Sequence, residues 1–361
     1  MKALIANRNI ASRLISLVTS NLTFGPGACI VDIPRPTISN DEILVKVKAV
    51  ALNPTDFKNI DSFSAPGAVV GCDYAGEVVQ VGTKVLGTWN VGDRVAGFVH
   101  GGLSPDRGAF AEYLKTDADL AWHIPNHMSD AEASTYGISA VTAMLSLNLR
   151  LNLPWLDEAS PRLSPVGEIF IYGGSTSAGL SHIQLAKAYG YKVITTASPH
   201  SYDLVRSYGA DAVYDYRSAS VIEDLTRNHP DIENAVDCYS EGRSTDICAE
   251  IIKNKGGKVI TLLPRGESKV AGVTYIWVIA YTLFGRTFRI MPPLGPKFEA
   301  NPDDRKGLAH FYANLPRLTS ILKPPPLKIS EEGFPGILDG LDTLRQQKIS
   351  GGKLVVMMKE K

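Results

Sequence analysis

Two stretches of the sequence combine residue types that can hold a phosphorylated nucleotide. The first, YGGSTSAGL at residues 172–180, follows an apolar segment and precedes a segment with helical spacing. Gly173 and Gly174 permit a tight turn and a close approach of the backbone, and the three hydroxyl residues that follow can bind phosphate oxygens. A helix that begins here presents free N–H groups and the positive end of its dipole. The stretch therefore predicts a pyrophosphate site. Its spacing departs from G-x-G-x-x-G, so an ordinary glycine-rich turn is the alternative.

The second stretch, TTASPHSYD at residues 195–203, lies where a dinucleotide site usually carries an acid that binds the ribose 2′-hydroxyl. Ser198 and His200 stand at the expected turn, whereas Asp203 falls inside the next predicted helix. A hydroxyl and an imidazole suit a 2′-phosphate, which a carboxylate would repel. We therefore expect NADPH as the cofactor. For His200 the alternative is a solvent-exposed loop histidine.

A third stretch, ALNPTDFKN at residues 51–59, closes a run of turn-forming residues with one lysine, Lys58. Asn, Pro and Asp each favour turns for backbone reasons of their own. A surface loop is the simplest interpretation. The position of the stretch directly after an apolar strand-like segment makes a role beside a ligand the alternative.

The elements that must position these residues follow two patterns. From Glu168 on, strand-like and helix-like segments alternate, which predicts parallel strands joined by right-handed helical crossovers. The strands are expected at residues 168–173, 192–197, 212–216, 234–239 and 257–263, and the helices at 180–190, 201–209, 220–228 and 244–254. Such an open doubly wound sheet binds its ligand outside the carboxyl ends of the strands, where the first two stretches lie.

The first 125 residues have a different texture. Short alternating or apolar segments, separated by Gly, Pro and Asp, predict antiparallel strands at residues 42–52, 74–82, 93–99 and 109–116. A chain of 361 residues exceeds what one hydrophobic core usually supports, so two domains are expected.

Composition excludes several other classes of protein. Lys plus Arg and Asp plus Glu both number 37, so no net charge favours nucleic acid or an anionic membrane over a small molecule. The four cysteines form no C-x-x-C pair. The first 25 residues lack an uninterrupted apolar segment of the signal-peptide kind, and the apolar run at residues 273–285 is too short to span a bilayer. We expect a cytoplasmic protein in which that run forms a buried or interface segment.

The order of the motifs resembles the medium-chain dehydrogenase/reductase superfamily over essentially the whole chain. The shared parts are GCDYAGEVVQVG and VGDRVAG in the β-rich region, YGGSTSAG at the start of the nucleotide-binding unit, and ISGGKLVV near the end. The resemblance implies an α/β fold with a GroES-like β-rich catalytic domain and a Rossmann domain with a doubly wound parallel sheet. We expect the first at residues 1–149, completed by residues 315–361, and the second at residues 150–314.

The resemblance also bears on metal binding. In zinc-dependent members a Cys stands at the position of Asn53, and Gly-His-Glu stands where this sequence has Gly71, Cys72 and Asp73. Catalytic zinc needs three protein ligands, and an amide cannot replace a thiolate. We therefore expect no metal. Without a Lewis acid, reduction of a ketone is disfavoured, whereas an activated carbon–carbon double bond delocalises the incoming charge through its own carbonyl group.

Within the zinc-free members, the sequence looks like the fungal trans-acting enoyl reductases that serve highly reducing polyketide synthases. The stretches NPTDFKN, SPHSYD and DAVYDYR carry this likeness, as does the proline-rich segment at residues 147–167. It implies transfer of a hydride from NADPH to the β-carbon of an α,β-unsaturated thioester on an acyl carrier domain. An NADPH-dependent quinone oxidoreductase and a non-catalytic NADPH-binding protein are the alternatives.

The same likeness implies a set of cofactor contacts. They are Thr55, Asp56, Phe57 and Lys58 beside the cofactor; Gly174, Ser175, Thr176, Ser177 and Ala178 at the pyrophosphate; Ser198, Pro199, His200 and Ser201 at the 2′-phosphate; Tyr216 near the adenosine; Leu262 and Leu263 along the nicotinamide ribose; and Val355 and Val356 beside the nicotinamide.

Two further segments are expected to line a substrate tunnel. Their residues are Gly137, Ile138, Ser139, Val141, Thr142 and Met144 in the first, and Leu283, Phe284 and Gly285 in the second. The alternatives are a plain core for the first segment and a dimer-forming strand for the second. Catalytic roles fall to Thr142, which can reach the nicotinamide or the substrate carbonyl, and to Lys58. The Lys58 ammonium can stabilise an enolate or anchor the cofactor, and a solvated loop lysine is the third possibility.

The sequence leaves the oligomeric state open. Many members of the superfamily pair through the last Rossmann strand, but the Gly- and Pro-rich segment at residues 284–304 would interrupt such a strand. This favours a monomer.

Overall fold

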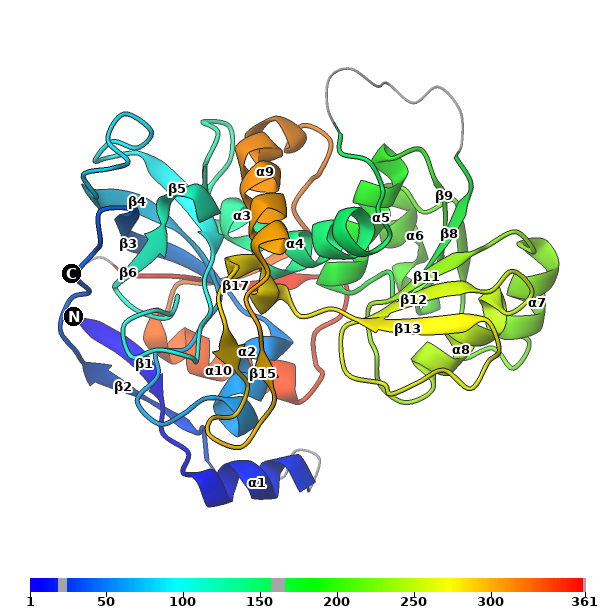
Figure 1. Ribbon diagram of the computed structural model, residues 1–361, viewed down its shortest axis with the longest axis horizontal. Coiled ribbons are helices and arrows are strands. Elements are labelled where there is room, and N and C mark those ends of the chain that lie inside the picture. Colours follow the sequence, from blue (N-terminus) through cyan, green and yellow to red (C-terminus); the bar gives the residue numbers. More distant parts are fainter. Residues whose placement is uncertain (19–24, 157–165, 360–361) are drawn as a thin grey trace.

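Two large sheets, one parallel and one mostly antiparallel, lie in opposite halves of the structure (Figure 1). The computed structural model describes residues 1–18, 25–156 and 166–359. The predicted α/β fold, a β-rich unit beside a doubly wound parallel sheet, is confirmed. The proline-rich segment at residues 147–167 is described only in part, because residues 157–165 lie outside the described ranges.

The parallel sheet has the strand order β10-β9-β8-β11-β12-β13. Its strands are β8 (Glu168–Tyr172), β9 (Lys192–Thr196), β10 (Ala212–Tyr214), β11 (Asn234–Asp237), β12 (Gly257–Thr261) and β13 (Val273–Trp277). The order reverses between β8 and β11, so the carboxyl ends of these two strands flank the crevice in which such sheets bind nucleotides.

The four crossover helices are α5 (Ser177–Ala188), α6 (Tyr202–Ser207), α7 (Val221–Asn228) and α8 (Ser244–Ile252). Each lies where the sequence predicts a helix, and the first five strands of the sheet also agree with prediction. The sixth strand, β13, was missed. It takes up the start of the apolar run at residues 273–285, and the rest of that run forms the 3-10 helix η6 (Ala280–Phe284).

The second sheet has the order β16-β17-β3-β4-β5-β7, with β6 paired to β3. Its strands are β3 (Glu42–Ala51), β4 (Asp73–Val81), β5 (Arg94–Phe98), β6 (Tyr113–Asp117), β7 (Ala121–His123), β16 (Leu327–Ser330) and β17 (Lys353–Met357). The last strand runs antiparallel to β3 and sets Val355 opposite Ala51. The chain therefore returns to its N-terminal half. The expected domain boundaries near residues 149 and 315 remain a prediction.

The remaining elements surround this second sheet and the junction. They are β1 (Lys2–Ala6), α1 (Ile10–Val18), β2 (Ala28–Asp32), α2 (Pro54–Lys58), η1 (Asn59–Phe63), η2 (Ala118–Leu120), α3 (Asp130–Ala133), η3 (Ser134–Tyr136), α4 (Ile138–Met144), η4 (Leu145–Arg150), β14 (Phe288–Arg289), β15 (Lys297–Phe298), α9 (Pro302–Leu318) and α10 (Phe334–Arg345). In the described part of the chain, no helix combines the length and apolar character that a membrane crossing requires.

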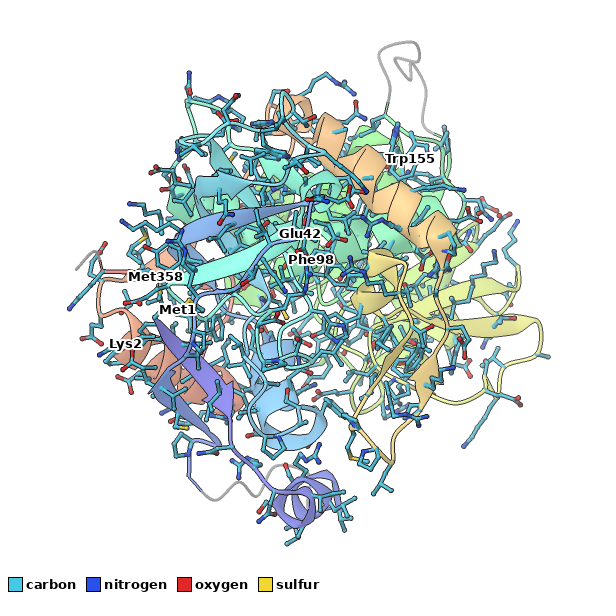
Figure 2. The ribbon with its side chains drawn as sticks, turned by 60° about the vertical axis from the view of Figure 1, so that its left-hand side comes forward. Met1, Lys2, Glu42, Phe98, Trp155 and Met358 are labelled. Carbon is cyan, nitrogen blue, oxygen red and sulfur yellow. The ribbon has the colours of Figure 1, made fainter. Side chains whose placement is uncertain are left out.

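Hydrophobic side chains from both halves fill the junction between the two sheets. One hydrophobic core runs from Ala49 in β3 through Val141 in α4 to Leu180 in α5. Helix α9 lies across this junction, and Trp155 packs beside it with its ring 4.5 Å from that of His310 (Figure 2). The elements on both sides of the nucleotide crevice therefore share one hydrophobic core.

Candidate active site

Helix α2 carries four of the predicted cofactor contacts, and its start is fixed by its own sequence. Pro54 occupies the first turn, where its missing N–H is not needed. The backbone N–H of Asn53 donates to Asp56 Oδ2 at 2.7 Å. Asp56 is fully buried and Phe57 is nearly so, which leaves Thr55 and Lys58 as the helix residues whose side chains extend toward the parallel sheet.

Beneath this helix lies a buried network of charged and amide groups. Lys353 Nζ donates to Asn53 Oδ1 and lies 3.5 Å from Asp73 Oδ2. Asn53 Nδ2 donates to the same carboxylate oxygen at 2.9 Å, and the backbone N–H of Ile138 donates to Asp73 Oδ1 at 2.7 Å. Asn53, Asp73 and Lys353 are each at most 3% exposed, so the network is sealed from solvent.

Burial shifts the proton affinities of this network. Desolvation, followed by the nearby charge of Asp73, raises the pKa of Asp56 to about 7. Desolvation also raises the pKa of Asp73, although the Lys353 ammonium opposes that shift. No group of three or more His, Cys, Asp or Glu side chains that could hold a metal ion occurs among the described residues. The amide of Asn53 accepts a hydrogen bond from the Lys353 ammonium.

Lys58 reaches across the crevice to the parallel sheet. Its Nζ lies 2.8 Å from Oε1 of Glu241, a residue in the loop that follows β11. This loop is fixed by Asp237, whose carboxylate accepts from the backbone N–H of Ser240 at 2.8 Å and from Ser244 Oγ at 2.7 Å. The Lys58 ammonium is therefore paired, at the edge of the crevice, with a carboxylate from this loop.

The glycine-rich turn between β8 and α5 has the close approaches that its sequence predicts. Gly173 adopts φ +76°, and Thr176 caps α5 by accepting from the backbone N–H of Gly179 at 2.9 Å. A Cβ atom at Gly179 would lie 2.3 Å from the Gly173 carbonyl oxygen, and one at Gly174 would lie 2.2 Å from Thr195 Oγ1. The turn thus presents Ser175, Ser177, Ala178 and the first N–H groups of α5, which suits a pyrophosphate.

The predicted 2′-phosphate residues also lie together. Ser198 precedes a 3-10 turn at Pro199–Ser201, and its Oγ donates to Tyr216 Oη at 3.3 Å. The Arg217 guanidinium lies 5.5 Å from the centre of the Tyr216 ring and pairs with Asp215 at 3.1 Å. Arg217 is a cation beside this cluster that the residue-by-residue prediction left out, although it belongs to the quoted stretch DAVYDYR.

The other predicted cofactor residues lie in a loop after β12 and in β17. Leu262 and Leu263 follow β12, and the backbone N–H of Leu262 donates to Ser240 Oγ at 2.8 Å, which joins two loops at the carboxyl edge of the sheet. Val355 and Val356 lie inside β17 and are buried. Their suggested contact with the nicotinamide remains a prediction.

The first predicted tunnel segment forms helix α4 and is mostly core. Val141 and Met144 are fully buried, Ser139 and Thr142 nearly so. A Cβ atom at Gly137 would lie 2.1 Å from Asp73 Oδ1, so this glycine lets the helix meet the buried network. The role of Thr142 remains a prediction.

The second tunnel segment lies in η6, which ends at Gly285 with φ +63°. Because it is a 3-10 helix, the alternative of a dimer-forming strand is wrong for Leu283 and Phe284. Leu283 is buried in the core, whereas Phe284 borders a cavity of about 140 Å³. The cavity is lined by side chains of both halves. Its apolar or aromatic members are Val99, His100, Leu103, Leu120, Tyr281, Phe284 and Phe288, and its polar or charged members are Ser104, Arg107, Thr116, Asp117, Arg286 and Thr287.

Comparison with known proteins assigns the chain to a family. Residues 39–126 match the alcohol dehydrogenase GroES-like domain, and residues 178–289 match the zinc-binding dehydrogenase domain. The trans-enoyl reductase caaB of Aspergillus niger is 38% identical over 340 residues, which cover 90% of this chain and 92% of the relative. The trans-enoyl reductase thnE of Trichoderma harzianum is 35% identical over 356 residues, covering 93% and 95%.

This chain belongs to the trans-enoyl reductases. Membership confirms the predicted resemblance, and it makes the protein an oxidoreductase of the medium-chain dehydrogenase/reductase superfamily. The trans-enoyl reductase chain superposes on the crystal structure of the CurK enoyl reductase with a TM-score of 0.74 at 18% identity, covering 99% of both chains. A mycobacterial protein solved with NADPH gives 0.70 at 18% identity and 99% of both chains. These structures share the fold of this chain.

In this trans-enoyl reductase, sequence reasoning missed Lys353, Glu241 and Tyr281. Lys353 lies in the quoted stretch ISGGKLVV, but nothing local distinguishes it from a surface lysine. Tyr281 sits inside an apolar run, two residues before the predicted tunnel residue Leu283. Its hydroxyl nevertheless meets polar side chains from α2 and η1.

Proposed function

We propose that this protein is an NADPH-dependent enoyl reductase that acts in trans on an α,β-unsaturated thioester. The acyl group would be carried by the acyl carrier domain of a highly reducing polyketide synthase, in secondary-metabolite biosynthesis. Relatives named trans-enoyl reductases, which align over nine-tenths of the chain, support the reaction and the external partner. Bound NADPH supplies the hydride for the β-carbon.

One observation favours a conjugated double bond over a ketone as the substrate. The Lys353 ammonium hydrogen-bonds to Asn53 beside Asp73, so the side chains that face the catalytic-metal position of zinc-dependent relatives already hold a fixed cation. A second cation there would be repelled. A conjugated thioester does not need a metal, because its carbonyl oxygen takes up the charge that hydride addition creates.

The chain's own residues divide the work of binding. The turn at residues 174–178 would hold the pyrophosphate, and Ser198, His200 and Tyr216 would hold the 2′-phosphate with Arg217 beside them. Thr55, Leu262 and Val355 belong to the segments expected near the nicotinamide. We assign Lys58 to the thioester oxygen, where its ammonium would stabilise the developing enolate. The predicted cytoplasmic location and monomeric state stand beside this proposal.

The proposal predicts a substrate preference that absorbance at 340 nm can measure. Purified protein should oxidise NADPH when crotonyl-pantetheine is added without zinc, and should leave a simple ketone unreduced. A simple quinone serves as the competing substrate. Turnover of the quinone alone would replace the proposal with a quinone oxidoreductase. NADPH binding without turnover of either compound, even when a carrier-bound enoyl thioester is supplied, would indicate a binding protein.

The choice of NADPH over NADH can be tested at the adenosine end. In the double variant Ser198→Ala/His200→Ala, the dissociation constant of NADPH should rise about 10-fold or more, because hydrogen bonds to a charged group contribute about 1.5–3 kcal/mol each. The dissociation constant of NADH should change less than about 2-fold by the same reasoning, since it lacks the phosphate. Fluorescence titration measures both constants.

Ser207→Ala is the matched control for this experiment. Ser207 is exposed near the end of α6 and donates only to the Leu204 carbonyl oxygen at 2.7 Å. Removal of the Ser207 hydroxyl should leave the dissociation constants of NADPH and NADH unchanged. An NADPH constant that is the same in Ser198→Ala/His200→Ala as in the wild type would show that these residues do not bind the 2′-phosphate.

A further inference from the structure

The hydroxyl of Tyr281 is held at the inner end of η6 by polar groups of the opposite half. Asn59 Nδ2 donates to it at 2.8 Å, Thr55 Oγ1 lies at 3.3 Å and Cys72 Sγ at 3.4 Å. The Nδ2 group of Asn59 can only donate, so it uses a lone pair of the Tyr281 oxygen and leaves the hydroxyl proton for another acceptor. That proton is available to Thr55, to Cys72 or to a ligand that lies beside Thr55.

The Tyr281 ring is fixed as firmly as its hydroxyl. It stacks on the His100 ring with centroids 3.6 Å apart and planes 12° from parallel, and Phe288 meets it edge-on. Thr282, the next residue, donates from Oγ1 to Asp304, which also forms two bonds with Arg150 at 2.6 and 2.8 Å. The side chain therefore has one orientation, with part of its surface on the cavity that Phe284 also borders.

Other titratable groups near this point are poorly placed to give a proton to a substrate. Asp117 borders the cavity, but it is ion-paired with Arg107 and Arg286, and its pKa is lowered although burial opposes that shift. Asp56 and Cys72 are fully buried and do not border the cavity. Asp73 is buried and accepts hydrogen bonds, and Lys58 is paired with Glu241. His100 does border the cavity, but desolvation lowers its pKa to about 3, so it is neutral at physiological pH and its remaining N–H is a weak acid.

We propose that Tyr281 is the residue that delivers the proton to the α-carbon of the reduced thioester. This rests on the proposed function, in which hydride arrives at the β-carbon and leaves an enolate. The O–H bond of Tyr281 breaks, its proton forms the new C–H bond at the α-carbon, and the electron pair of the broken bond stays on the phenolate oxygen. Asn59 Nδ2 stabilises that oxygen by donating to it, and water then returns the proton.

The surroundings of Tyr281 suit a donor that must keep its proton until the enolate forms. Burial, with the neighbouring thiol of Cys72, raises the pKa of the Tyr281 hydroxyl well above its ordinary value. The group is therefore fully protonated at neutral pH. An enolate carbon is a far stronger base than a phenolate, so the transfer remains favourable.

The test follows the fate of the proton. Crotonyl-pantetheine is reduced with NADPH in D₂O, and the configuration of the deuterium at the α-carbon of the product is determined. Wild type should give one configuration, because the donor reaches one face. Tyr281→Phe should give both configurations, because water then protonates either face, and its kcat should fall about 100-fold, as for loss of a general acid. Its NADPH dissociation constant should stay within about 2-fold of wild type, since Tyr281 is assigned no cofactor contact.

A buried tyrosine elsewhere supplies the matched control. Tyr189 donates to Asn148 Oδ1 at 2.7 Å within the hydrophobic core, and Tyr189→Phe should change neither rate nor configuration. A single configuration from Tyr281→Phe would overturn the proposal even if kcat fell, because a hydroxyl that only positions the thioester would give that result. Should Tyr281→Phe not fold, deuterium in both configurations from wild type would also overturn it. Wild type that reduces no enoyl thioester would instead refute the proposed function.

Discussion

Replacement of Lys353 by methionine should lower the free energy of unfolding by about 3–5 kcal/mol, the cost of removing one partner of a buried ion pair. The Lys353 ammonium donates to Asn53 and faces the Asp73 carboxylate in a region that water does not reach. Methionine keeps most of the volume, so the loss arises from the unpaired carboxylate rather than from a cavity. Chemical denaturation followed by circular dichroism measures this difference.

The size of this loss should depend on pH. Lys353 lowers the pKa of both Asp56 and Asp73, so its removal raises both pKa values further above those of the unfolded chain. When the pKa of a carboxyl group is higher in the folded protein than in the unfolded chain, the free energy of unfolding falls as the pH rises from the unfolded pKa to the folded pKa. Lys353→Met should therefore be closer to wild type at pH 5 than at pH 8.

Two variants separate the ion pair from a general effect of losing a lysine. Lys328 lies exposed on the neighbouring strand β16, and Lys328→Met should change the stability by less than about 0.5 kcal/mol. Asp73→Asn added to Lys353→Met should restore part of the lost stability, because it neutralises the orphaned carboxylate. If Lys353→Met unfolds with the wild-type midpoint at pH 8, the network does not stabilise the fold.

The fold was predictable because its signals are local. The segment from β8 through α5 to β9 shows a short apolar run, a glycine turn and helical spacing within 30 residues, and each of these follows from the preferences of neighbouring residues. Helix α9 was not predicted. It carries Pro316 inside the helix. Proline is disfavoured in the interior of a helix, so its presence argues against a helix when only the sequence is considered.

The candidate site was predictable only where one turn, or the ends of neighbouring parallel strands, supply it. The pyrophosphate turn and the pair of Ser198 with Tyr216 fall into this class, since parallel strands bring their carboxyl ends to one edge. Lys353 and Asn53 are 300 positions apart, and Tyr281 and Asn59 are 222 apart. No local pattern links such pairs, so their meeting depends on how β17 joins β3 and how η6 packs at the junction.

Lys58→Met should reduce kcat for the enoyl thioester by about 100- to 1,000-fold, the range measured when one preorganised donor to a developing oxyanion is lost. The change keeps most of the side-chain volume and removes the ammonium, with its charge and its hydrogen-bond donors. At saturating NADPH the loss should appear in kcat, and the NADPH dissociation constant should change less than about 3-fold, because an interaction made only in the transition state does not alter binding. Steady-state kinetics and fluorescence titration measure the two quantities.

The partner of Lys58 refines this expectation. Glu241 Oε1 lies 2.8 Å from Lys58 Nζ, and Glu241 belongs to the loop that Asp237 fixes. Glu241→Gln keeps the lysine charged but removes its ion pair, so the position of the ammonium is less fixed. Its kcat should fall by about 10-fold or less, since positioning contributes less than the charge itself. Lys84→Met is the control, because Lys84 pairs with Asp41 on the exposed surface. A raised NADPH dissociation constant with unchanged kcat in Lys58→Met would make this lysine a cofactor anchor, and Glu241 would then orient it toward the cofactor rather than toward the thioester.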